Sequence, residues 1–334
     1  MGKNKESKVF RISSQIINCT LLLFVASTAF AAEDYPVKPI SIVVAYAPGG
    51  QGDTFARLVG EKLTTALKQS VVVDNKPGVS GTIGTRLAAK AKNDGYTLLL
   101  GQTGEIVVNR LLIKDMGYDP IKELIPVVLI GNAPLIMLAP ADAPYNTVAE
   151  FIQAAKAKSG EFSYGSVGAG TPGHLSAVAL ALGAKINMVH VPYKGVGSLM
   201  ADLMTNRLQA FFSSASAAMP QIKGGKLKAL AVTTPQRMSS LPNVPTVAEA
   251  GLAGFSYSLW GGLFAPAGTP AAVVDRLSRE VNTILAQPEL KARLEADNVA
   301  VPKNLPKDFA DYVRAESIKF ERLVKDADLK IDPN

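Results

Sequence analysis

Three glycine-rich turns carry the residues of this 334-residue chain that best suit ligand binding. They are Pro48-Gly49-Gly50-Gln51-Gly52, residues 78–84 and residues 165–173. Each follows a β-rich run and precedes a helical run. A helix that begins at such a turn offers free backbone N–H groups and the positive end of its dipole, and glycine lets a ligand approach the main chain. One such turn can be only a tight corner, but three together favour an anion site.

The third turn also fits the G-x-G-x-x-G pattern of dinucleotide-binding proteins, as Gly168-Ala169-Gly170-Thr171-Pro172-Gly173. That pattern needs an acidic residue roughly 20 residues later to bind the ribose. No Asp or Glu occurs between Glu161 and Asp202. We therefore expect no nucleotide cofactor, and the sequence predicts no other cofactor.

Catalytic and metal-binding residues are also poorly supported. Ser166 does not lie in a G-x-S-x-G nucleophile elbow, and the sequence has only two histidines, His174 and His190. His174, at the start of a helix, either binds a carboxylate or caps the helix, whereas His190 lies in a strand pattern typical of a core residue. With no acidic cluster either, we predict no catalytic residue and no metal site.

The first 31 residues read as a signal peptide. Four cations, Lys3, Lys5, Lys8 and Arg11, precede an apolar run over residues 16–30, and Ala29-Phe30-Ala31 is an A-x-A cleavage site. The alternative is a retained membrane anchor, but the run is short for a bilayer, which needs about 20 apolar residues. We expect export and cleavage after Ala31.

The charge of the chain excludes one class of partner. The net charge is +7, of which the signal peptide holds four cations and the anion Glu6, so the remainder carries +4. Its Lys and Arg are scattered rather than gathered in a stripe with aromatics, so we expect no nucleic-acid partner. A mild positive excess suits an anionic ligand.

Strand and helix patterns alternate along the chain, which predicts an α/β fold with parallel sheets. Residues 40–46, 71–73 and 97–100 read as strands, and the helix after the first turn buries a stripe with Phe55, Val59 and Leu63. A second group of strands is expected at 135–139, 162–164, 189–191, 210–212 and 229–233. About 300 residues suggest two cores. We predict lobe 1 from residues 32–103 and 230–334, and lobe 2 from residues 104–229.

Ordered motifs along the chain resemble one family, the tripartite tricarboxylate receptors, or Bug family of periplasmic binding proteins. The matching motifs include Pro48-Gly49-Gly50 with Asp53 and Arg57, Asn75-Lys76-Pro77-Gly78, Asp94-Gly95-Tyr96-Thr97, Tyr164-Gly165-Ser166, Val191-Pro192-Tyr193-Lys194-Gly195, Trp260 and Ala265-Pro266-Ala267-Gly268-Thr269-Pro270. Departures occur at Ala45, where proline is common, at Ser80, where glycine is common, and at Pro172. Because these lie beside the expected pocket, they bear on the ligand rather than on the family.

This resemblance implies a two-lobed periplasmic-binding-protein fold, type II-like, in which each lobe is a mostly parallel sheet flanked by helices and a cleft lies between them. It implies a periplasmic protein that binds a small mono-, di- or tricarboxylate and docks on integral-membrane transporter subunits. We also expect the exported protein to be a monomer. Carried over by position, the expected ligand contacts are Tyr46, Gly49, Gly50, Ser80, Ser166, Gly170, Thr171 and His174. Asp53 and Arg57 are expected to support the first turn.

The same glycine-rich turns and expected cleft are compatible with two alternative functions. A secreted enzyme could act on a small organic acid in the same cleft, and a ligand sensor could dock on a signalling partner. The sequence does not identify the carboxylate, because backbone amides recognise charge and length more than identity.

Overall fold

The computed structural model describes residues 35–296, 298–301 and 303–329. The chain divides into two compact units, Met1–Val37 and Lys38–Asn334, and the fold described below is that of the second. The predicted signal peptide and its cleavage site lie outside the described residues and stay predictions. Within the described part of the chain, no helix combines the length and apolarity needed to cross a membrane.

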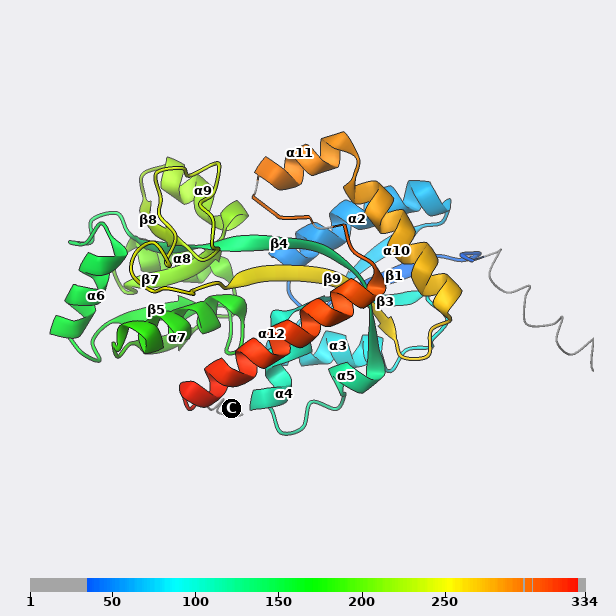
Figure 1. The fold of residues 1–334 in the computed structure, drawn as a ribbon, viewed down its shortest axis with the longest axis horizontal. Helices are drawn as coiled ribbons and strands as arrows, with labels where there is room; N and C mark the ends of the chain where they lie inside the picture. Colours follow the sequence, from blue (N-terminus) through cyan, green and yellow to red (C-terminus); the bar gives the residue numbers. More distant parts are fainter. Residues whose placement is uncertain (1–34, 297, 302, 330–334) are drawn as a thin grey trace, which may run out of the picture. The chain divides into compact units, whose positions relative to one another are not determined.

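The described strands join into one sheet in the order β2-β1-β3-β9-β4-β7-β5-β6, with β8 paired to β4 off this path (Figure 1). Their bounds are β1 (Ile40–Val44), β2 (Val71–Asn75), β3 (Thr97–Gln102), β4 (Leu124–Pro140), β5 (Ser163–Ser166), β6 (Val189–Pro192), β7 (Ala210–Ser214), β8 (Leu227–Val232) and β9 (Ser258–Pro266).

The long strand β4 divides the sheet into two halves. Its first part, Leu124–Pro134, pairs with β9, and its second part, Leu135–Pro140, pairs with β7 and β8. We call β2, β1, β3, β9 and the first part of β4 the β1 half, and the remaining strands the β5 half. β1 is parallel to β2 and β3, and β5 is parallel to β6 and β7, whereas β4 and β9 run antiparallel to their partners.

The helices follow the strands as the alternating pattern predicts. Their bounds are α2 (Gln51–Leu67), the short turn η2 (Val79–Gly81), α3 (Thr82–Ala89), the π-helix η3 (Gly104–Val108), α4 (Asn109–Leu112), α5 (Pro120–Glu123), α6 (Val148–Ala157), α7 (Pro172–Ala184), α8 (Val196–Met204), α9 (Ala215–Lys223), α10 (Ala271–Leu285), α11 (Pro288–Ala296) and α12 (Pro306–Asp326). The α/β class is confirmed.

The predicted strands and the first helix form the core of the β1 half. Phe55, Val59 and Leu63 of α2 are fully buried, as the helical stripe predicts, and β1 is buried along most of its length. Burying one such side chain contributes about 1.5–3 kcal/mol. This packing attaches α2 to the sheet and so places the first glycine-rich turn at the carboxyl end of β1.

The predicted strand at 135–139 is only the end of β4. Residues 124–134 were not predicted as strand, because Gly131, Asn132 and Pro134 interrupt their pattern. β4 accommodates the interruptions with irregular pairing to β9 between Pro126 and Val128 and between Leu129 and Gly131. Pairing with the distant strand β9 therefore extends β4 beyond the residues whose own sequence pattern predicts a strand.

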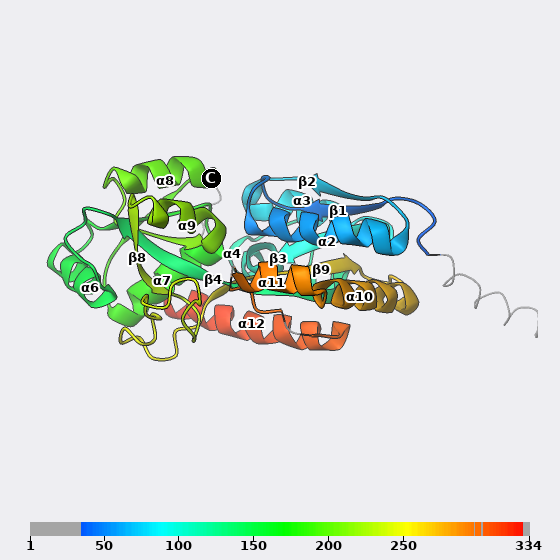
Figure 2. The ribbon, with the colours of Figure 1, turned by 90° about the horizontal axis from the view of Figure 1, so that it is seen from above.

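The C-terminal helix α12 packs along β4 (Figures 1 and 2). The indole of Trp260 on β9 donates a hydrogen bond of 3.2 Å to Glu316, and Phe309 and Phe320 are buried on the same helix. Ala327 and Leu329, just beyond it, line a hollow together with Val178 of α7. The chain just beyond α12 therefore lies beside α7, which packs on β7 and β5 of the other half of the sheet.

Candidate functional site

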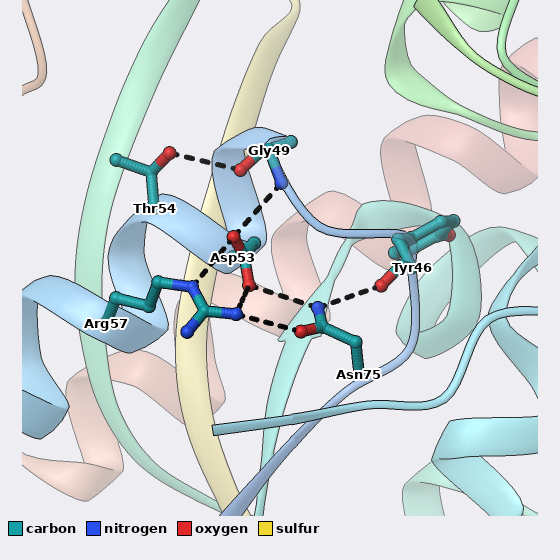
Figure 3. A network of polar contacts seen from close by, with 7 residues as sticks. Tyr46, Gly49, Asp53, Thr54, Arg57 and Asn75 are labelled. Carbon is teal, nitrogen blue, oxygen red and sulfur yellow. Dashed lines mark hydrogen bonds and ion pairs between the residues drawn. The ribbon is translucent and has the colours of Figure 1, made fainter. Parts of the chain in front are cut away.

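The first glycine-rich turn is built around the buried carboxylate of Asp53 (Figure 3). One oxygen accepts from the N–H of Gly49 at 3.0 Å, and Arg57 and the amide of Asn75 donate at 3.0 Å each. Asn75 also donates to the carbonyl of Tyr46 at 3.1 Å. Burial raises the pKa of Asp53, but these hydrogen bonds outweigh it and hold the pKa below its usual range. The predicted supporting role of Asp53 and Arg57 is confirmed, and Asn75 shares it.

The second turn has an unusual backbone. Gly78, Val79, Ser80 and Gly81 have φ angles of 138°, 46°, 52° and 87°. A β-branched residue such as valine rarely adopts this region, and each strained residue costs on the order of 1–3 kcal/mol. The amide of Asn109 donates to the carbonyl of Ser80 at 2.9 Å, and the Thr82 hydroxyl donates to that of Val79 at 2.9 Å. Such strain persists only where the surroundings impose it, and it concentrates at functional sites.

The Tyr46 side chain joins the first turn to the second. Its hydroxyl lies 2.8 Å from Oε2 of Glu105 and 3.3 Å from the carbonyl of Ser80. Glu105 is fully buried, and its Oε1 accepts the N–H of Gln102 at 2.6 Å. Burial raises the pKa of Glu105 to about 7 against the opposing effect of these hydrogen bonds. The sequence interpretation missed Glu105, although it stands just beyond the carboxyl end of β3, where parallel strands place ligand-binding residues.

The third turn is held by its own hydroxyl groups. Ser166 and Thr171, both buried, donate to the carbonyl of Gly168 at 2.9 and 2.7 Å. Gly168 N–H donates back to the Ser166 hydroxyl at 3.1 Å. In this structure the two predicted ligand contacts Ser166 and Thr171 therefore shape the turn that precedes α7.

The two histidines stack beneath this turn, with ring centroids 4.1 Å apart. Gly170 N–H donates to Nδ1 of His174 at 3.0 Å, so the neutral ring carries its proton on Nε2. His190 lies with Nε2 2.7 Å from the Ser166 hydroxyl, and is partly exposed rather than in the core. Burial lowers the pKa of His174 to about 3, with His190 adding to the effect, and lowers that of His190 to about 4. Both rings are neutral at pH 7, so neither attracts a carboxylate by charge.

The structure brings the second and third turns together. The Ser80 hydroxyl donates to the carbonyl of Ala169 at 3.3 Å. A methyl group placed on Gly104 would lie 2.7 Å from the Tyr46 hydroxyl and 3.7 Å from the carbonyl of Gly170. Of the predicted contacts, Tyr46 and Ser80 therefore adjoin the turn that holds Ser166, Gly170, Thr171 and His174. Gly49 and Gly50 lie at the start of α2 instead, and among the described residues nothing lies within 4 Å of a methyl group placed on Gly49.

The helices at these turns begin without a side-chain cap. α2, α3 and α7 start at Gly50, Gly81 and Thr171, and none of the three has a side-chain cap hydrogen bond. α6 differs, because the Thr147 hydroxyl accepts the N–H of Glu150 and so caps its start, while the Glu150 carboxylate accepts the N–H of Asn146. Thr246 and Glu249 form the two reciprocal hydrogen bonds of a capping box, although they close a turn rather than begin a helix. Uncapped helix N-termini at the carboxyl ends of parallel strands suit an anionic ligand.

Two other features lie away from these turns. A cavity of about 1200 Å³ lies among α10, α11, residues 299–301 and residues 303–308, and none of the predicted site residues lines it. Within the described residues, no group of three or more His, Cys, Asp or Glu side chains could hold a metal ion.

An α/β sheet whose strand ends carry glycine turns and uncapped helix N-termini suits a protein that binds a small anionic solute. The chain belongs to the tripartite tricarboxylate transporter family receptor family, TctC, whose model matches residues 55–329. The resemblance seen in the sequence is thereby confirmed.

Solved structures of three relatives share the fold. Rpa4515 of R. palustris with adipate is 33% identical, with a TM-score of 0.85 over 89% of this chain and 99% of that one. The periplasmic binding protein BugD is 34% identical, with a TM-score of 0.81 over 89% and 99%. MatC from Rhodopseudomonas palustris with bound malate is 31% identical, with a TM-score of 0.80 over 87% and 100%. The two-lobed binding-protein fold is confirmed, whereas the predicted lobe boundaries stay predictions.

Proposed function

We propose that this protein is a non-catalytic periplasmic receptor that captures a small carboxylate and delivers it to a tripartite tricarboxylate-type membrane transporter. It is exported, loses residues 1–31 and acts as a monomer. Residues 32–103 and 230–334 form one lobe and residues 104–229 the other, and both contact the ligand. The proposed contacts are Tyr46, Gly49, Gly50, Ser80, Ser166, Gly170, Thr171 and His174.

The observation that carries this proposal is the meeting of two uncapped helix starts, seen in the 3.3 Å contact between Ser80 and Ala169. A hydrogen bond to a charged group contributes about 1.5–3 kcal/mol, and a helix dipole adds about 0.3–1 kcal/mol. A carboxylate between these turns gains both contributions. The adipate and malate named for two relatives support a small aliphatic carboxylate as the ligand.

The test begins with a thermal-shift screen of small carboxylic acids, because a ligand at 100 times its dissociation constant adds about 2.7 kcal/mol of stability. The best acid is then compared by calorimetric titration with its fully methylated ester. Removing the charge removes both contributions, so we expect the ester to bind at least about 100-fold more weakly, or about 2.7 kcal/mol. An ester that binds as tightly as the acid would contradict the anion site.

Thr171→Val is the matched variant in this titration. It deletes one hydroxyl, which donates to the carbonyl of Gly168, but leaves the backbone amides and the helix dipole in place. We expect it to weaken binding of the acid less than esterification does. Recovery of the acid chemically unchanged after incubation with the protein separates a receptor from an enzyme.

A further inference from the structure

The buried carboxyl of Glu105 is an acid that the proposed binding of a carboxylate does not use. Glu105 belongs to η3, which begins directly after β3, and it is fully buried. Its Oε1 accepts the N–H of Gln102 at 2.6 Å, its Oε2 lies 2.8 Å from the hydroxyl of Tyr46, and its own backbone N–H also hydrogen-bonds to the carboxyl. All of these partners are neutral.

The charged groups on the neighbouring elements pair with one another instead. Two titratable side chains face this acid, Tyr46 and Tyr118. Tyr118 donates a hydrogen bond of 2.7 Å to the backbone carbonyl of Glu105. Arg110 on α4, which follows η3, pairs with Glu321 of α12. On α5 and its flank, the ion pairs are Lys122–Asp119 and Lys90–Glu123. Within the described residues, Glu105 forms no ion pair, so its negative charge would be uncompensated.

Glu105 is also close to the third turn. Gly104 precedes it, and a methyl group on Gly104 would lie 2.7 Å from the Tyr46 hydroxyl and 3.7 Å from the carbonyl of Gly170. The Tyr46 hydroxyl is 3.3 Å from the carbonyl of Ser80, whose own hydroxyl bonds to Ala169. Tyr46 is itself a proposed ligand contact, and its hydroxyl lies between the Glu105 carboxyl and the carbonyl of Ser80 on the second turn.

We propose that Glu105 is a specificity-determining residue, whose charge disfavours a second carboxylate on the ligand at the Tyr46 end of the site. This inference rests on the proposed function and narrows its substrate class. The preferred ligands are carboxylates whose other end is uncharged, such as an amide or a hydroxyl. Diacids, which two relatives are named as binding, are disfavoured here when Glu105 is ionised.

The hydrogen-bond pattern allows a neutral side chain at position 105. Tyr46 has one hydroxyl proton and two acceptors in reach, Glu105 and the carbonyl of Ser80. When Glu105 is ionised, Tyr46 donates to it. When Glu105 is protonated, it can donate to Tyr46, which then donates to Ser80. Glu105→Gln reproduces the second pattern, because its amide donates where the protonated acid would.

The experiment compares diacids with their monoamides by calorimetric titration at pH 8.5. The probes are succinate, glutarate and adipate, each beside its monoamide, and the measured quantity is the ratio of the diacid dissociation constant to the monoamide dissociation constant. In Glu105→Gln we expect this ratio to fall at least about tenfold relative to wild type, or about 1.4 kcal/mol. The control is Glu316→Gln, which removes another buried carboxylate, one that pairs with Lys319. It should leave the ratio unchanged.

A second measurement needs no variant. Above pH 6 the carboxyls of the diacids are mostly ionised, since ordinary carboxyls titrate near pH 4. In wild type, the same ratio should therefore fall about tenfold between pH 8.5 and pH 6.0, as Glu105 takes up a proton. Glu105→Gln should show no such change.

The outcomes separate this inference from the proposed function. Binding of diacids and monoamides with the same ratio in wild type and Glu105→Gln, at both pH values, overturns the role of Glu105 alone. Failure of wild type to bind any acid in the thermal-shift screen overturns both proposals.

Discussion

Replacing Asp53 by alanine is expected to lower the free energy of unfolding by about 2–4 kcal/mol. The carboxylate is 5% exposed and accepts hydrogen bonds from Gly49, Arg57 and Asn75. Its removal leaves the Asn75 amide and the Gly49 N–H without this acceptor. Arg57 adds little, because its side chain is 54% exposed and a solvated ion pair is weak. Because the first turn then loses its support, carboxylate binding should weaken as well.

Urea unfolding and calorimetric titration measure the two effects. Asp74→Ala is the matched control, since Asp74 pairs with Lys76 on the surface and both side chains are about two-fifths exposed. That pair should contribute less than about 1 kcal/mol. Asp53→Asn keeps one acceptor oxygen and should fall between wild type and Asp53→Ala. Equal stabilities of Asp53→Ala and Asp74→Ala would contradict the supporting role.

Acidification is expected to destabilise the protein through the stacked histidines. The pKa values of His174 and His190 are about 3 and about 4 in the folded protein, against an ordinary 6.5. Below pH 6.5 the imidazoles become protonated in the unfolded protein but stay neutral in the folded protein. The contribution of the two neutral histidines to the free energy of unfolding is therefore fully present above pH 6.5. It falls as the pH drops towards 4, by about 1.4 kcal/mol per pH unit for each proton.

Glu105 acts in the opposite direction. Its pKa of about 7 in the folded protein exceeds the ordinary 4.5, so the folded state holds an extra proton between these values. The contribution of protonated Glu105 to the free energy of unfolding is fully present below pH 4.5 and is lost as the pH rises through 7. Between pH 4.5 and 6.5, unfolding takes up two protons on the histidines and releases one proton from Glu105, a net uptake of about one proton. The free energy of unfolding therefore rises by about 1.4 kcal/mol per pH unit over this interval.

Variants separate the two contributions in urea unfolding between pH 4.5 and pH 8. His190→Gln keeps a hydrogen-bonding side chain near Ser166 but removes one titrating ring, so the slope between pH 4.5 and 6.5 should fall by about one proton. Glu105→Gln should raise the slope by about one proton over the same interval. A slope in His190→Gln equal to that of wild type would show that His190 does not resist protonation in the folded protein.

Much of the fold was predictable because its signals are local. The apolar stripe of α2, with Phe55 and Leu63, and the Thr147 cap at the start of α6 depend on residues within a few positions of each other. The three glycine turns and the ordered motifs were sufficient to identify the receptor family, which the match over residues 55–329 confirms. The sequence alone therefore determined the α/β class, the family and the turns where a ligand is expected.

The tertiary structure decided which side chains meet. Glu105 lies in a mixed run, Gly104-Glu105-Ile106-Val107-Val108, where a single acid reads as exposed, yet pairing of β3 with β1 buries it beside Tyr46. His174 accepts the N–H of Gly170 and stacks on His190, which belongs to the separate strand β6. The antiparallel pairing of residues 124–134 with β9 likewise joins segments more than 100 residues apart. Local patterns report the period and caps of one element, whereas contacts between elements depend on strand register and helix packing, which only the folded chain specifies.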